Sequence, residues 1–112
     1  MGKFDLPVVA WLAFVGAALL EVGGDAMIRK GLRGSGFAFV AAGGLVLACY
    51  GVLVNTVRWD FSKLLGVYVV VFALVSILWG RFVFGENVPY STWLGLGIIV
   101  VGGLVIQFGQ GR

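Results

Sequence analysis

The chain has 112 residues, of which 61% are apolar and only 12% charged, whereas a soluble domain carries about 25% charged residues. So few charges cannot cover a globule in water, and the length leaves room for one domain at most. The 8 basic and 5 acidic residues are also grouped, which leaves residues 6–20, 34–57, 64–80 and 87–111 free of charge. Because a helix needs roughly 20 mainly apolar residues to cross the hydrocarbon layer, we predict an all-α, multi-pass protein of the plasma or inner membrane.

In chain order, we expect membrane-spanning helices over residues 7–28, 37–57, 64–84 and 91–108. Pro7 is suited to the first turn of the first helix. Short connections of about six to eight residues make adjacent helices antiparallel. The whole chain, residues 1–112, is therefore predicted to form a single four-helix transmembrane bundle.

Several functions are excluded by composition. The net charge of +3 comes from short connecting segments, so it indicates anchoring at the membrane surface rather than nucleic-acid binding. The chain has no histidine and one cysteine, Cys49, so neither a His/Cys metal cluster nor an intrachain disulfide can form. We expect no cofactor, no metal and no enzymatic activity.

The basic residues are divided equally between the two sides of the predicted membrane topology. One side holds Lys3, Arg58, Lys63 and Arg112, and the other holds Arg29, Lys30, Arg33 and Arg81. A bias of Lys and Arg in short loops sets orientation, and no such bias exists here. The balance favours dual topology, in which copies insert both ways and pair as an antiparallel homodimer. The alternative is that unequal distances from the membrane still bias insertion.

Glu21, Asp25 and Arg29 lie on one face of the first helix, because each follows the previous one by four residues. A charge in the membrane interior is costly and by default indicates a functional site. Removal from water favours the protonated form of a carboxyl group in general, so Glu21 is predicted to bind protons and a cationic substrate in turn. The alternative is a structural carboxylate satisfied by Tyr or Trp donors. Asp25 is expected to pair with Arg29 or Lys30, and it is also a candidate binding residue.

Aromatic side chains recur along one face of the third helix, at Tyr68, Phe72 and Trp79, with the Ser76 hydroxyl between them. Aromatic walls suit delocalised or apolar cations, so these aromatic residues are predicted to line the substrate pocket. Tyr50 of the second helix is a further candidate, as a hydroxyl donor to Glu21. Packing against lipid or within the bundle explains such an aromatic face nearly as well.

The fourth helix carries no charge and has small residues in a stripe. Gly95 and Gly102 are seven residues apart, with Ile98 and Ile99 between them. Small residues let helix backbones approach closely in membranes. We therefore predict that Gly95, Ile98, Ile99 and Gly102 form the dimer contact, with packing inside one protomer as the alternative.

These features resemble the small multidrug resistance family of the drug/metabolite transporter superfamily. Residues 20–24 (LEVGG) are similar to that family's membrane-embedded glutamate motif, residues 66–68 (GVY) to the start of its third helix, and residues 95–102 to its dimerisation motif. The resemblance implies that Glu21 binds protons and substrate in turn, that Tyr68 lines the pocket, and that an antiparallel homodimer alternates access.

The chain departs from that family at several positions. Val71 stands where the family has a tryptophan, and Asp25 and Arg29 add charges to the first helix. Residues 66–69 and 79–85 also resemble a poorly characterised sister branch of small four-helix membrane proteins.

The leading functional prediction is a proton-coupled exporter of small cationic or amphipathic compounds that uses alternating access. One alternative is half of a flippase for lipid-linked or amphipathic metabolites, with Asp25 and Arg29 forming a headgroup pocket. Another is a membrane assembly or regulatory subunit that transports nothing.

Overall fold

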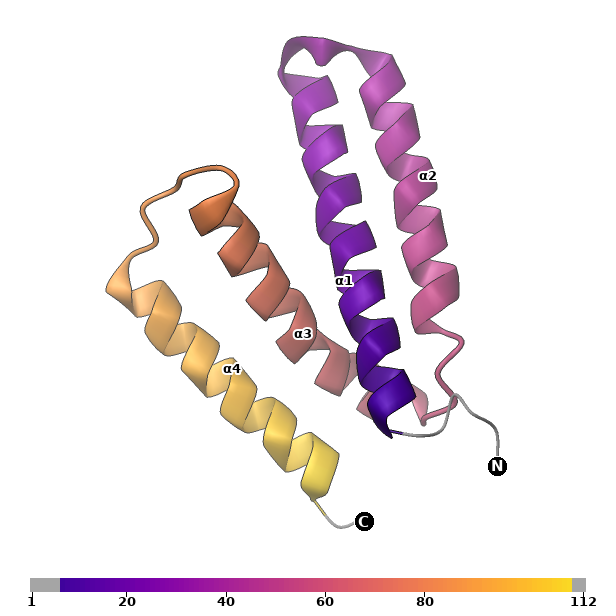
Figure 1. Cartoon of the computed structure of the whole chain (residues 1–112), viewed down its shortest axis with the longest axis vertical. Helices are drawn as coiled ribbons and strands as arrows, with labels where there is room; N and C mark the ends of the chain where they lie inside the picture. Colours follow the sequence, from indigo (N-terminus) through magenta and orange to yellow (C-terminus); the bar gives the residue numbers. More distant parts are fainter. Residues whose placement is uncertain (1–6, 110–112) are drawn as a thin grey trace. The chain divides into compact units, whose positions relative to one another are not determined.

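The computed structural model describes residues 7–109 and is all-α (Figure 1). Its long helices are α1 (Pro7–Lys30), α2 (Phe37–Val54), α3 (Phe61–Phe82) and α4 (Tyr90–Phe108). All 4 are long and apolar enough to cross a membrane. The predictions of an all-α class and of a multi-pass membrane protein are thus confirmed.

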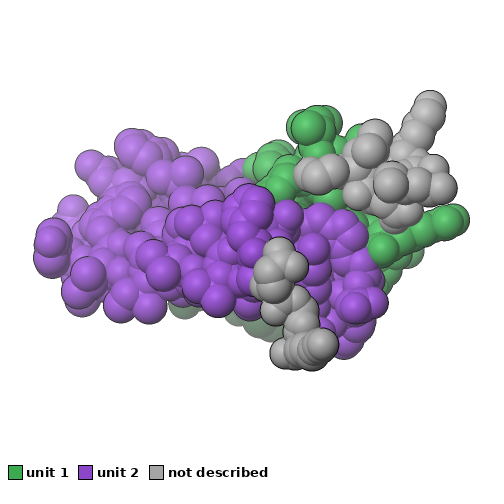
Figure 2. All heavy atoms as spheres, turned by 90° about the horizontal axis from the view of Figure 1, so that it is seen from below, with its two compact units in different colours: residues 1–58 green, residues 59–112 purple. Residues whose placement is uncertain are grey.

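The chain divides into two compact units, Met1–Arg58 and Trp59–Arg112, which are coloured separately in Figure 2. The first unit contains α1 and α2, and the second contains α3 and α4. We refer to them as the N-terminal hairpin and the C-terminal hairpin. Each is described by itself below.

A close approach of two glycines joins the helices of the N-terminal hairpin. A Cβ atom added to Gly24 of α1 would lie 2.9 Å from the carbonyl oxygen of Gly43, and one added to Gly43 of α2 would lie 2.6 Å from the carbonyl oxygen of Gly24. Neither position has room for a side chain. The two backbones therefore pack against each other directly, as small residues allow in membrane helices.

The two faces of α1 differ in the size of their side chains. The buried residues are mostly small and comprise Ala10, Phe14, Ala17, Ala18 and Val22. The exposed large residues are Val8, Leu12, Val15 and Leu19, which repeat at helical spacing. A contiguous exposed apolar stripe of this kind is what a lipid-facing helix presents.

The turn Gly31–Ser35 reverses the chain between α1 and α2. Gly34 and Gly36 have φ angles of 124° and 100°, values that side-chain-bearing residues rarely adopt. Next to this turn, the Lys30 ammonium lies 4.9 Å from the centroid of the Phe39 ring. This cation–π contact links the end of α1 to the start of α2.

Glycines also bring the helices of the C-terminal hairpin together. A Cβ atom at Gly103 of α4 would overlap the side chain of Val70 on α3, and one at Gly66 of α3 would lie 2.8 Å from Ile106 Cδ1. At the start of α3, the Lys63 ammonium lies 4.5 Å from the centroid of the Trp59 ring, which precedes the helix. The apolar residues buried in this unit are Leu64, Val67, Tyr68, Val70, Val71, Ala73 and Leu96.

Side chains that follow α2 explain why it ends at Val54, three residues before the predicted end at residue 57. Asn55 Nδ2 donates to the Gly51 carbonyl at 2.8 Å, and Thr56 Oγ1 donates to the Leu53 carbonyl at 2.6 Å. The same two carbonyl groups also accept from the backbone N–H groups of Asn55 and Thr56, at 3.3 Å and 3.1 Å, so side chain and backbone together close the last turn. Hydropathy alone does not detect such hydrogen bonds from side chains to the helix backbone.

The other helices differ by one to three residues from their predicted ends. α1 continues to Lys30 because basic residues are favoured in the last turn of a helix. α3 begins at Phe61, since the Leu64 N–H already donates to the Asp60 carbonyl at 2.8 Å. It ends at Phe82, where the N–H groups of Val83 and Phe84 both donate to the Trp79 carbonyl.

Two residues of the predicted charge balance, Lys3 and Arg112, lie outside the described residues.

The two adjacent glycines of α1 provide a matched test of its packing. Gly24→Ala is expected to lower the free energy of unfolding of the hairpin by about 1–3 kcal/mol, because the new methyl group meets the α2 backbone. Gly23→Ala is expected to leave stability unchanged or raise it by up to about 1 kcal/mol, because nothing lies within 4 Å of its Cβ position. Thermal unfolding of both variants in detergent micelles measures the difference. Equal unfolding temperatures would contradict the assigned packing.

Candidate functional site

Glu21 lies well inside the membrane-spanning part of α1. Lys30 at the end of the helix lies nine positions further along the chain, which corresponds to roughly 14 Å along the axis. Its side chain is half-buried. Its near neighbours on the same helix include the small residues Ala17, Ala18 and Gly24, all of which are buried.

The N-terminal hairpin brings three of the predicted site residues together. Tyr50 of α2 is half-buried, and it lies close enough to Glu21 and Asp25 for both carboxylates to act electrostatically on its hydroxyl. A phenol can donate a hydrogen bond to a carboxylate. The arrangement therefore combines two acids from α1 with a hydroxyl donor from α2.

Asp25 is more accessible than Glu21. It is exposed, as is Arg29 one turn further along α1. An exposed ion pair at this spacing contributes only about 0.3–0.5 kcal/mol. The pairing of Asp25 with Arg29 stays a prediction. Over residues 7–109, no group of three or more Cys, Asp or Glu residues could hold a metal ion.

The predicted aromatic residues all belong to α3, in the C-terminal hairpin. Tyr68 is buried, with 3% of its surface exposed, and its ring centroid lies 6.4 Å from that of Phe72 at an angle of 35°. Trp79 is half-buried, and within the described part of the chain its indole N–H is buried without a hydrogen-bond partner. The predicted site residues are thus divided between two units, three in each.

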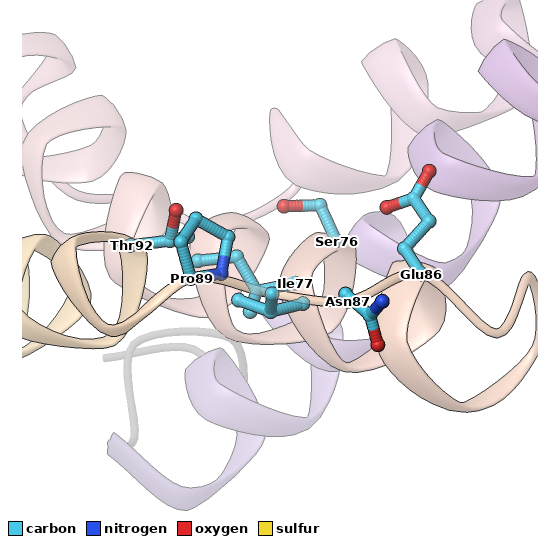
Figure 3. A pocket seen from close by; sticks show the side chains of 7 residues that line it. Ser76, Ile77, Glu86, Asn87, Pro89 and Thr92 are labelled. Carbon is cyan, nitrogen blue, oxygen red and sulfur yellow. The ribbon is translucent and has the colours of Figure 1, made fainter.

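A cavity that the sequence analysis did not predict lies where α3 is connected to α4 (Figure 3). Its volume is about 190 Å³, and it is lined by Ser76, Ile77, Glu86, Asn87, Val88, Pro89 and Thr92. Only Ser76 was among the residues singled out from the sequence. Glu86 was not among them, although an acid directly after Gly85 and shortly before Pro89 was a usable signal.

The predicted dimer residues are accessible on α4. Ile98 and Ile99 are 65% and 37% exposed, and nothing lies within 4 Å of a Cβ atom added at Gly95 or Gly102. The close contact inside the C-terminal hairpin is made by the neighbouring Gly103. The stripe is therefore open to a second helix, and dimerisation stays a prediction.

The chain belongs to the family described as "Uncharacterised BCR, YnfA/UPF0060 family", whose family model matches residues 8–112. It is 31% identical over 103 residues to the UPF0060 membrane protein YfjF of Bacillus subtilis, covering 90% of this chain and 94% of that protein. UPF0060 membrane proteins of Staphylococcus carnosus and Rhodococcus erythropolis are 36% and 35% identical, covering 85% and 88% of this chain and 90% and 94% of their own lengths. No solved structure matches the chain.

The family match corrects the interpretation based on resemblance. Assignment to the small multidrug resistance family is wrong, because the family model and the relatives all belong to YnfA/UPF0060. The features behind the resemblance were four apolar spans, one acid within a span and spaced glycines. Each follows from the general physics of small membrane proteins, so together they do not distinguish one family from another.

Proposed function

We propose that this member of the YnfA/UPF0060 family is a proton-coupled exporter of small cationic or amphipathic compounds, with Glu21 as the shared binding group. The observation that carries the proposal is the half-buried Glu21 carboxylate, roughly 14 Å from the nearer end of its helix and beside Tyr50. An acid at such a depth opposes insertion by about 2.5–3.5 kcal/mol on translocon scales. Its retention is explained if the carboxyl group has a function there.

Competition for one carboxylate supports coupled exchange. A protonated Glu21 is neutral and has no charge with which to hold a cation, whereas an ionised Glu21 attracts one. If the carboxylate faces the two sides of the membrane alternately, a proton entering from one side replaces a cation leaving to the other. The ligand then shifts the conformational equilibrium by its differential affinity for the two states.

Tyr50 and Asp25 have supporting roles in this proposal. The Tyr50 hydroxyl stabilises the ionised carboxylate between two binding events, since a donor to the charged form favours it. Asp25, which is exposed one turn nearer the helix end, provides a first point of attraction for a cation. The aromatic rings of Tyr68, Phe72 and Trp79 favour substrates with an apolar or delocalised charge.

The working unit in this proposal is a homodimer, antiparallel in the simplest case. Balanced loop charges favour insertion in both orientations. The open stripe formed by Gly95, Ile98, Ile99 and Gly102 on α4 supports a helix-to-helix contact between copies.

Transport by the Glu21→Gln variant tests the proposed role of the carboxylate. In vesicles containing purified wild-type protein, a gradient of a monovalent organic cation such as tetraphenylphosphonium is expected to drive protons across the membrane in the opposite direction to the cation. Glu21→Gln should lose at least about 90% of this flux, because an amide neither binds a proton nor carries a negative charge. A pH-sensitive dye inside the vesicles measures the flux.

Asp60→Asn is the matched control, because it removes an exposed carboxylate from the connection before α3. It is expected to transport at the wild-type rate. Normal coupled flux through Glu21→Gln would overturn the proposal, provided that the variant is incorporated to the same level.

A pair of glycine variants on α4 tests the dimer contact. Gly102→Leu is expected to reduce association several-fold, because a large side chain separates the two helices. Gly97→Leu should leave association unchanged, because Gly97 lies on the opposite face of α4 and also has nothing within 4 Å of its Cβ position. Energy transfer between labelled copies in vesicles measures both. Equal association of the two variants would contradict the proposed contact.

A further inference from the structure

We propose that the cavity at the connection between α3 and α4 binds a small organic ammonium ion, with the Glu86 carboxylate as counter-ion. All residues that line this cavity belong to the C-terminal hairpin. Glu21 belongs to the other unit, and nothing in the proposed transport mechanism uses Glu86. The inference therefore goes beyond the proposed function and does not rest on it.

Two features place Glu86 against the end of α3: a backbone hydrogen bond, and a glycine that has no side chain to keep the carboxylate away. Its N–H group donates to the Gly80 carbonyl at 2.9 Å. A Cβ atom at the buried Gly80 would lie 2.5 Å from Glu86 Oε1, so the carboxylate rests directly against the bare helix backbone. Within residues 7–109, no hydrogen bond or ion pair neutralises this carboxylate.

The other polar groups around the cavity also favour a hydrogen-bond donor. Ser76 Oγ donates its proton to the Ala73 carbonyl at 3.1 Å, which leaves the oxygen lone pairs as acceptors. In Figure 3 the Ser76 hydroxyl and the Glu86 carboxylate lie on the same side of the connecting segment, whereas the Asn87 amide is directed away. The cavity thus presents a negative charge and an acceptor oxygen on one side.

An anion has little to bind here. None of the lining residues is basic, and the Arg81 guanidinium lies over the Phe82 ring, 5.4 Å from its centroid. In the first turn of α4, the N–H groups of Thr92 and Trp93 both donate to the Pro89 carbonyl, at 2.9 Å and 3.4 Å. These N–H groups are therefore engaged within the helix rather than offered to a ligand.

Size and lining select a short alkylammonium ion. The volume of about 190 Å³ is below the roughly 300–1,000 Å³ of pockets for drug-sized ligands. Ile77, Val88 and Pro89 supply apolar surface for one or two carbon atoms, while the ammonium group donates to Glu86 and Ser76. A bare inorganic cation prefers several oxygen ligands, and the cavity has a single carboxylate.

The test is an NMR titration of the full ¹⁵N-labelled chain in detergent micelles with ethanolamine hydrochloride at neutral pH. Amide shifts at Gly80, Glu86 and Thr92 are expected to change and to saturate. Ethylene glycol, a neutral molecule of similar size, should produce no saturable change. Glu86→Gln should raise the dissociation constant about five- to tenfold, because the variant loses the counter-ion.

Two further variants and one salt make the result decisive. Gly80→Ala should also weaken binding, because the new methyl group displaces the Glu86 side chain, whose free end is flexible enough to move without unfolding the hairpin. Asp60→Asn should bind as wild type. Unchanged binding by Glu86→Gln, equal binding of ethylene glycol, or full displacement by equimolar potassium chloride would overturn the proposal. If the shifts are lost in Glu21→Gln but not in Glu86→Gln, the ammonium ion binds at Glu21 rather than in the cavity. That outcome would overturn this proposal and leave the proposed transport site intact.

Discussion

The direct contact between the backbones of α1 and α2 at Gly24 and Gly43 positions the polar groups of the N-terminal hairpin. Lipid tails are as apolar as the side chains, so helices in a bilayer gain little by hiding apolar surface from one another. Packing and polar contacts must hold them instead. The glycine contact lies one turn from Glu21, and it brings Tyr50 of α2 within electrostatic reach of Glu21 and Asp25. A wider spacing of the helices would separate the phenol from the acids.

Two acids in this chain occupy contrasting environments. Glu21 is half-buried within a span, among alanine and glycine, and interacts with a partner helix. Glu86 is exposed at the end of a hairpin and lies against the backbone of α3. Burial and nearby donors change how readily a carboxyl group takes up a proton in general. Similar side chains thus support different chemistry at different depths.

Most of the fold could be predicted from the sequence, because the length of an apolar stretch is set by the thickness of the hydrocarbon layer. The C-terminal end of α2 could not, since Asn55 and Thr56 bond to carbonyl groups of the last turn. Glu21 became a candidate because a charge within a span is conspicuous, and Tyr50 became one as a hydroxyl donor to it. The cavity containing Glu86 was missed because it depends on the path of the connection and on the bare backbone at Gly80. The assignment to the small multidrug resistance family was wrong, because the features on which it rested are common to small membrane proteins.

The unequal lengths of α1 and α2 have a consequence for how the N-terminal hairpin fits a bilayer. α1 has 24 residues and α2 has 18, which correspond to roughly 36 Å and 27 Å. A hydrocarbon layer of about 30 Å therefore covers α2 completely but leaves a turn or more of α1 at headgroup depth. Lys30 stacks on Phe39 near the start of α2, and Gly16 lies level with Leu53 near its end, so the surplus length of α1 lies at its Pro7 end. In a thicker membrane the surplus turn of α1 enters the hydrocarbon layer and α1 still spans it, whereas α2 falls further short of the layer thickness.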